Sequence, residues 1–205
     1  MAAALPGTDF QGSMLHNKSW EFRDQEDKNN AVHLSAGQYS RSNKLQGRYN
    51  SSVLDTYQRA FRDQPQPSHQ FLDVGCGTGD FTREGLLPRC LPCRRIVGVD
   101  SSPEMIEYAR KHSAHAKLDF RVLDICADVT GILDEFGHFD RVYSFYCLHW
   151  ADDLGVALKN VAKLLTPTGE CLLVFYASHE SAPVWRALAR MERWKNYSEV
   201  GVVAA

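Results

Sequence analysis

The 205-residue sequence lacks any cationic run longer than two residues, and its Lys and Arg residues number 23 against 25 Asp and Glu. A binding surface for nucleic acid or for an anionic membrane needs clustered positive charge, so both partners are excluded by this pattern. The longest apolar run, CLLVFYA at 171–177, is too short to span a bilayer, and MAAALPGTDF is not a signal peptide. We therefore expect a cytoplasmic protein with a small-molecule partner; oligomeric state is left open.

Cysteine is also sparse, and its placement does not indicate a metal site. Four of the six cysteines, Cys76, Cys126, Cys147 and Cys171, lie in or beside strand-like segments, which is typical of small apolar residues in a reducing compartment. Cys90 and Cys93 form a single C-x-x-C pair without the second ligand pair of a zinc site. We interpret the pair as part of an ordinary loop and predict no metal.

The chain divides into an arm and one domain. Residues 1–37 are polar and without periodicity, which predicts a disordered or loosely attached arm. The domain is predicted over 38–205. It opens with LQGRYNSSVLDTYQRAF, whose apolar side chains recur every four residues from Leu45 to Phe61 and so predict a helix that DQPQPSHQ ends.

Beyond that helix, short apolar runs alternate with helical patterns. Helices are expected over FTREGLL, from Pro103 and over DDLGVALKNVAKLL, with Ser101 or Ser102 capping the second and Asp152 or Asp153 the third. Strict alternation of strand and helix predicts an α/β fold with a doubly wound, mostly parallel sheet. The five expected strands cover 71–75, 95–100, 119–124, 140–148 and 170–177.

The turn after the first strand is the expected ligand site, because ligands of such sheets bind at the carboxyl ends of the strands. It reads DVGCGTGD at 73–80, and glycines at alternate positions allow a ligand to approach the backbone closely. A dinucleotide-binding loop would have glycine or alanine where Asp80 stands. Carboxylates at 73 and 80 repel an anion and tolerate a cation, which makes an NAD-dependent oxidoreductase the least favoured reading.

This loop resembles the first motif of the class I S-adenosylmethionine (SAM) methyltransferases, acidic-x-Gly-x-Gly-x-Gly. By resemblance, Asp100 at the end of the second strand accepts the ribose hydroxyls, Asp124 meets the adenine amino group, and Ile125 packs on the adenine ring. Each aspartate alone would more often be a turn residue, but their occurrence in order with the glycine loop favours the cofactor. The cofactor-binding residues implied are Asp73, Gly75, Cys76, Gly77, Gly79, Asp100, Ser101, Asp124 and Ile125.

Two further segments indicate where a substrate would bind: QYSRSNKLQ at 38–46 and SFYCLHW at 144–150. Together they resemble the insect juvenile hormone acid O-methyltransferases, a branch of the class I family, from about Tyr39 to Trp194. The resemblance implies that Gln46 and Trp150 are the catalytic pair that holds a substrate carboxylate. A carboxylate is already ionised at neutral pH, so such a site needs hydrogen-bond donors and no general base.

An apolar pocket would favour this reaction, because a carboxylate and a sulfonium combine into two neutral products. Tyr146, Leu148 and Trp185 are candidates for its wall. From the residues alone, Trp150 is equally well an aromatic side chain of the core or its rim, and His149 a surface histidine without an assigned role. The implied substrate is a small isoprenoid or fatty acid, similar to juvenile hormone acid or farnesoic acid.

The expected strands are fewer than the family has. Class I methyltransferases end in a sixth and a seventh strand, and neither is found in WKNYSEVGVVAA at the end of the chain. We therefore expect a domain that is incomplete at its carboxyl end. The alternative function is a truncated, inactive fragment or isoform that binds SAM without turnover, with an open edge strand.

Overall fold

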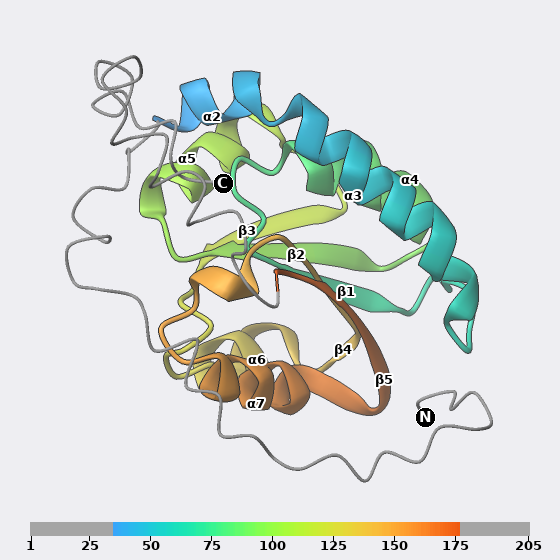
Figure 1. Ribbon diagram of the computed structural model, residues 1–205. Coiled ribbons are helices and arrows are strands. Elements are labelled where there is room, and N and C mark those ends of the chain that lie inside the picture. The colour runs from blue at the N-terminus through green and yellow to red at the C-terminus, as the bar shows by residue number, and fades with distance from the viewer. Residues whose placement is uncertain (1–34, 177–205) are drawn as a thin grey trace, which may run out of the picture. The chain divides into compact units, whose positions relative to one another are not determined.

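The computed structural model describes residues 35–176, so most of the predicted arm and the candidate Trp185 lie outside the described residues. The described part contains a five-stranded sheet in the order β3-β2-β1-β4-β5, with every neighbouring pair parallel (Figure 1). This confirms the predicted doubly wound sheet. The strands are β1 (Gln70–Val74), β2 (Arg95–Asp100), β3 (Leu118–Val122), β4 (Phe139–Phe145) and β5 (Leu165–Val174).

Helices cover both faces of the sheet. In Figure 1 one face carries α2, α3, α4 and α5, and the other face carries α6 and α7. A π-helical turn, η2, leads into α4 directly after the glycine loop, and 3-10 turns follow α3 and β4. The bounds are α2 (Ala36–Ser42), α3 (Lys44–Tyr57), η1 (Gln58–Ala60), η2 (Thr82–Leu86), α4 (Leu87–Cys90), α5 (Pro103–His112), α6 (Thr130–Phe136), η3 (Leu148–Trp150) and α7 (Leu154–Leu164).

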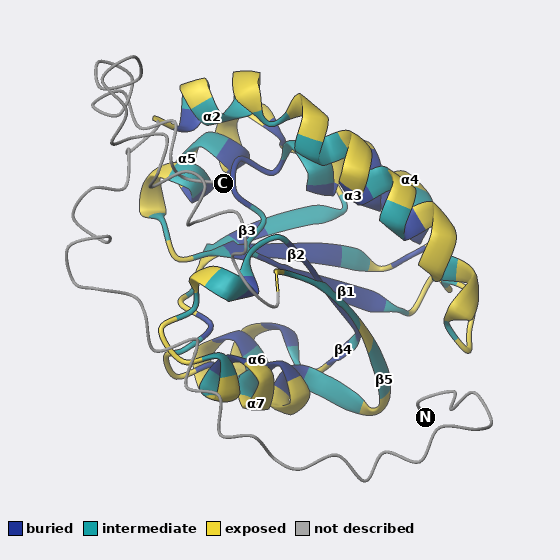
Figure 2. Cartoon of the chain, viewed as in Figure 1, coloured by how far each residue is buried: buried dark blue, intermediate teal, exposed yellow. Residues whose placement is uncertain are grey.

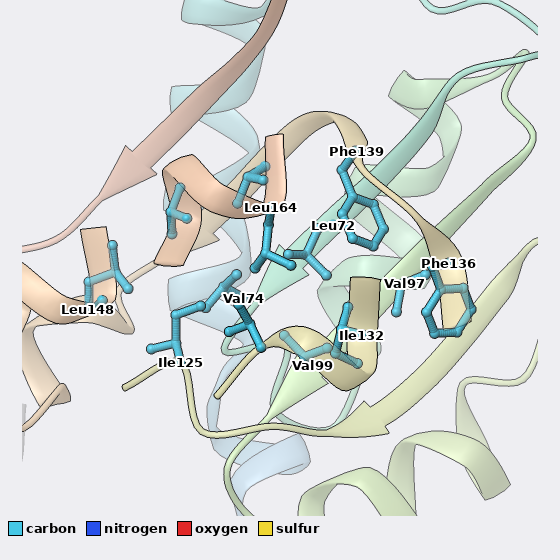
Figure 3. Packing of buried hydrophobic residues seen from close by; sticks show 14 residues of the cluster. Leu72, Val74, Val97, Val99, Ile125, Ile132, Phe136, Phe139, Leu148 and Leu164 are labelled. Carbon is cyan, nitrogen blue, oxygen red and sulfur yellow. The ribbon is translucent and has the colours of Figure 1, made fainter. Parts of the chain in front are cut away.

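Two apolar layers hold the helices to the sheet. On the α6–α7 face, Leu72, Val97 and Val142 of the strands pack with Ile132 and Leu164 of the helices (Figure 3). On the other face, a second cluster is built around the strand residues Phe71, Ile96 and Tyr143. All five residues of β1 are buried (Figure 2), as expected for a central strand covered on both faces. Full burial of an apolar side chain such as Phe71, Leu72 or Val74 stabilises the fold by roughly 1.5–3 kcal/mol.

Side-chain caps begin three of the helices. Ser102 accepts a hydrogen bond from the Met105 amide at the start of α5, and Asp153 accepts one from the Val156 amide at α7. Both caps confirm sequence predictions. Ser35 forms a reciprocal capping box with Gln38, so that α2 begins at Ala36, two residues before the predicted start of the domain.

The part of the predicted apolar stripe that lies in α3 does not face the core, whereas its last residue, Phe61, lies beyond this helix and packs against the second cluster. Leu45, Tyr49 and Tyr57 are 60%, 57% and 55% exposed, whereas the buried residues of α3 are Asn50 and Leu54. The four-residue spacing correctly predicted a helix, and the helix turns its more polar side inward. A buried asparagine indicates a polar space beneath this helix.

Two strand boundaries differ from prediction, and one helix was not predicted. The strand expected to run to residue 148 ends at Phe145, because Tyr146 has a φ of 52° and turns the chain away from the sheet. Strand β5 begins at Leu165 instead of residue 170, with an irregularity in its pairing to β4 near Phe139 and Arg141. Helix α6 has no predicted counterpart. Within residues 35–176, no helix combines the length and apolar character needed to cross a membrane.

Candidate active site

The glycine loop lies between β1 and η2 and is fixed to the end of β2. The amides of Gly75 and Cys76 both donate to the Val99 carbonyl, at 2.8 and 3.0 Å. Gly75 has a φ of 76°, and a Cβ atom at this position would lie 2.2 Å from Sγ of Cys147. Glycine at 75 is thus required twice, by the backbone conformation and by the thiol packed against it.

Asp100 holds the middle of that loop from the end of β2. One carboxylate oxygen accepts the Gly77 amide and the other accepts the Ser102 amide, both at 2.9 Å. Burial raises the pKa of Asp100, and these two hydrogen bonds oppose the rise. The side chain therefore links the loop to the first turn of α5.

Asp73 is the buried carboxylate at the base of the loop. It is 3% exposed and accepts a hydrogen bond of 2.6 Å from the Thr82 hydroxyl of η2. Burial raises the pKa of Asp73 to about 6; the Thr82 bond lowers it and the Asp100 charge raises it. A bound cation near this carboxylate would relieve that cost by favouring its ionised form.

A cavity of about 1040 Å³ opens beside the loop, between it and the α2–α3 pair. Asp73, Gly75 and Cys76 line one side, and Gln46 and other α3 residues line the opposite side. The lining includes four carboxylates and two cations, and because the carboxylate of Asp55 is paired with Arg89 outside the lining, an excess of one negative charge remains. These charged residues are Asp55, Asp73, Asp80, Glu84, Lys44 and Arg48.

Helix α2 and the start of α3 are bound to this loop by polar contacts. Asn43 donates from its amide nitrogen to Asp80 at 3.3 Å, and Asp80 also accepts from the Thr78 hydroxyl at 2.8 Å. Farther back, the Ala36 amide donates to Glu104 of α5 at 2.9 Å. Asp80 thus connects the glycine loop to the start of α3 through Asn43.

Tyr39 lies against the loop itself. A Cβ atom on Gly77 would lie 3.3 Å from the Tyr39 ring. Burial raises the pKa of Tyr39 to about 12, and the charges of Asp100 and Asp80 add to the rise. The sequence motif includes Tyr39 and Asn43, yet no role was predicted for either. Their roles depend on how α2 lies over the loop, which spacing along the chain does not reveal.

The other predicted cofactor residues lie around the end of β3 and the start of α5. The Leu123 amide donates to the Asp100 carbonyl at 2.9 Å, which brings Asp124 to the same end of the sheet. Asp124 accepts the Cys126 amide at 2.8 Å and is exposed, while Ile125 is 7% exposed and belongs to the core cluster. Ser101 is exposed, and neither it, Asp124 nor Ile125 lines the 1040 Å³ cavity.

The two predicted catalytic residues occupy different surroundings. Gln46 lines the cavity from α3, whereas Trp150 lies on η3, is 49% exposed and does not line it. Leu148, predicted as a pocket wall, is 1% exposed and packs in the core cluster. Of the two predicted catalytic residues, only Gln46 lines the cavity beside the glycine loop.

Aromatic rings gather where β4 and β5 end, and we call Tyr146, His149, Trp150 and Tyr176 the aromatic shelf. The ring centroids of Tyr146 and Tyr176, His149 and Tyr176, and His149 and Trp150 are 5.2, 5.1 and 5.2 Å apart. Burial raises the pKa of Tyr146, and the phenols of Tyr176 and Tyr49 raise it further, which places Tyr49 of α3 near the shelf. The shelf offers an apolar surface with polar tips.

Comparison with known proteins gives one family match. Residues 71–169, from β1 into β5, match the model of a methyltransferase domain. Two juvenile hormone acid O-methyltransferases, from Bombyx mori and Drosophila melanogaster, are each 36% identical to the chain over 80% of its length. The match covers 58% and 56% of those two relatives, so the chain spans less than two thirds of their length.

Solved structures share the fold. The plantazolicin methyltransferase BpumL, solved with S-adenosylhomocysteine and a substrate analogue, superposes with a TM-score of 0.56 at 20% identity, covering 88% of this chain and 64% of its own. A SAM-bound amino pentose methyltransferase from Micromonospora echinaspora gives 0.53 at 21% identity, covering 73% of this chain and 59% of its own.

Proposed function

We propose that the chain is a class I methyltransferase, with its catalytic domain in the region matched at residues 71–169, and that it transfers a methyl group from SAM to the carboxylate of a small apolar acid. The observation that carries this proposal is the acidic cavity beside the glycine loop. Its negative excess suits a cationic, phosphate-free cofactor better than a dinucleotide.

The residues present fit SAM on the structure's own evidence. The absence of side chains at Gly75 and Gly77 leaves space along the loop that a Cβ atom would reduce. Asp100 lies next to this loop, and two backbone amides fix the orientation of its carboxylate. Asp100 is suited to accept ribose hydroxyls, and Asp124 with Ile125 to hold an adenine at the adjacent strand end. When bound, SAM supplies a methyl group on a sulfonium, which a carboxylate oxygen accepts to form a methyl ester.

The chain's own contribution is to orient the acid and exclude water. Gln46 has an amide and Trp150 an indole N–H, and each can donate to a carboxylate without adding a full charge that would bind the nucleophile too tightly. Because Trp150 is half exposed, we propose that it turns toward Gln46 when the acid binds. The aromatic shelf then covers the hydrocarbon chain, which favours an isoprenoid or fatty acid over a small hydrophilic one.

An alternative function is supported by one observation. Gln46 lines the large cavity and Trp150 does not, so the two predicted catalytic residues do not share a cavity. The alternative function is therefore that of a protein that binds SAM and does not transfer its methyl group.

One pair of measurements separates the two functions. SAM calorimetry reports cofactor binding, and a radiolabelled-methyl assay against isoprenoid and fatty acids reports turnover. An enzyme shows both, and a non-catalytic SAM-binding protein shows only the first. The same assay on a chain extended with the last two strands of a relative is the control: turnover that appears only after extension supports the alternative.

A further inference from the structure

A second cavity, of about 190 Å³, lies at the other end of the sheet. It is lined by the end of α3, by η1, by Arg89 of α4 and by Arg141 near the start of β4. Three arginines, Arg59, Arg89 and Arg141, face it together with Gln58 and Gln64, and no carboxylate is among its lining residues in the described part of the chain. We call it the arginine cavity.

One of the three arginines is neutralised by an ion pair. Arg89 forms two hydrogen bonds to the Asp55 carboxylate, at 2.7 and 2.9 Å. Arg59 is exposed and forms no hydrogen bond or ion pair within residues 35–176. The arginine cavity therefore retains an excess of positive charge after the Asp55 pair is counted.

Arg141 is the unusual member, because it is 4% exposed and yet has no acidic partner among the described residues. Its guanidinium donates to the backbone carbonyl of Asp63 and, at 3.5 Å, to the Tyr143 hydroxyl. It also lies 4.0 Å from the centroid of the Phe61 ring. None of these contacts carries a full negative charge.

A buried arginine cannot avoid the cost of its uncompensated charge by losing its proton, because the guanidinium stays protonated in proteins. Removing an ion from water is expensive unless a counter-charge and further hydrogen bonds replace the lost hydration. The Phe61 ring and the two oxygens supply part of that replacement, and the remaining N–H groups of Arg141 are available to the cavity. An anion in the cavity would supply the missing charge.

We propose that the arginine cavity binds a small oxyanion, a phosphate or carboxylate group, between Arg59 and Arg141. The planar guanidinium matches the oxygen spacing of such groups and contacts them through two parallel hydrogen bonds. A volume of 190 Å³ equals that of about six water molecules, which holds a phosphate-sized ion and excludes a nucleotide. Gln58 and Gln64 provide additional amide donors at the rim.

The test is thermal unfolding of the full 205-residue chain in sodium phosphate and in sodium chloride at equal ionic strength. A ligand that binds only the folded protein raises the Tm by about 3–6 °C when phosphate is at roughly ten times its Kd. Equal Tm values in the two salts up to about 50 mM phosphate would overturn the proposal. Acetate at matched ionic strength distinguishes the two oxyanions: a larger shift than with phosphate assigns the cavity to a carboxylate.

Three variants test whether the phosphate-dependent rise in Tm comes from the arginine cavity. R59Q removes an exposed side chain that the described fold does not use, so it is expected to fold normally and to lose most of the phosphate-dependent shift. R141M removes the buried charge at similar volume and is expected to abolish that shift. R94Q is the matched control, because Arg94 is exposed and lies outside the cavity. A shift that persists unchanged in R59Q, whatever the stability of R141M, would show that phosphate binds elsewhere.

Discussion

The large cavity and the arginine cavity use the same helix and the same sheet and have opposite charge. At the carboxyl ends of the strands, Asp73 and Asp80 contribute to a formal excess of negative charge. At the amino end of β4, Arg59 and Arg141 give an excess of positive charge. Helix α3 contributes to both, with Asp55 in the first lining and Leu54 in the second.

The two cavities therefore differ in charge as well as in volume, and both differences restrict which ligand each could bind. A glycine loop before a helix is a ready anion site because its amides point outward. Here Asp100 already accepts the Gly77 amide, which leaves fewer donors for a phosphate. The loop is thereby converted from an anion site into one suited to a cation.

The largest effect is expected for G75A, which should prevent ligand binding in the large cavity and leave the arginine cavity unchanged. The new Cβ would overlap Cys147, and the backbone would be held at a φ of 76°. We expect a loss of about 3 kcal/mol in the free energy of unfolding and at least a hundredfold weaker SAM binding by calorimetry. G131A is the matched control, since nothing lies within 4 Å of its added Cβ. An unchanged SAM affinity in G75A would contradict the assigned loop geometry.

The next prediction concerns how the free energy of unfolding depends on pH through Asp73 in the large cavity. The pKa of Asp73 is raised from 3.8 to about 6, so the folded protein binds a proton there more tightly than the unfolded chain does. Its contribution to stability is thus present at low pH and is lost as the pH rises through about 6, by at most about 3 kcal/mol. D73N, which still accepts the Thr82 hydroxyl, should flatten the denaturation free energy between about pH 4 and 6. An identical pH profile in both proteins would refute this assignment.

A substitution at Asp100 tests whether the carboxylate that holds the glycine loop, next to the large cavity, also serves the cofactor. In D100N one carboxylate oxygen becomes an amide that faces a backbone N–H, either of Gly77 or of Ser102. We expect SAM affinity to fall about thirtyfold, or about 2 kcal/mol, by calorimetry. D119N is the control, because Asp119 pairs with Arg95 on the sheet away from the loop. Equal affinity in the two variants would exclude a cofactor role for Asp100.

The smallest effect is expected for W150F, which leaves both cavities intact. Trp150 is half exposed and lines neither, so SAM affinity should be unchanged. Loss of the indole N–H to a substrate carboxylate should reduce kcat/KM about tenfold or more in the methyl assay. A parallel loss of SAM affinity would show that Trp150 has a structural role instead.

Much of the sheet was predictable because a buried parallel strand has a short, continuous apolar sequence. FLDVG and RIVGVD correspond to β1 and β2 within one residue, and Ser102 and Asp153 cap helices as expected. Helix α6 escaped prediction because it has seven residues and no side-chain cap bond. The early end of β4 depends on the turn at Tyr146, which no local apolar pattern reveals.

The site was predictable only along the loop and strand ends. Asp73 and Asp100 follow apolar runs at recognisable spacing, and both lie where expected. The α2–α3 wall was not predictable, because the exposed stripe of α3 resembles a core-facing one and its inward face carries Asn50. Arg141 gave no signal either, since an arginine within a strand normally faces water.

The contact between Gly75 and Cys147 joins two segments that lie 72 positions apart and would be altered separately by an engineer. Residue 147 sits in the segment that a redesign for a new acceptor would target, between Tyr146 and Leu148. Because its sulfur fills the space that any side chain at 75 would need, a bulkier residue at 147 displaces the glycine loop itself. Under the proposed function, substrate preference and cofactor binding are therefore coupled through this contact, and libraries should vary positions 75 and 147 together.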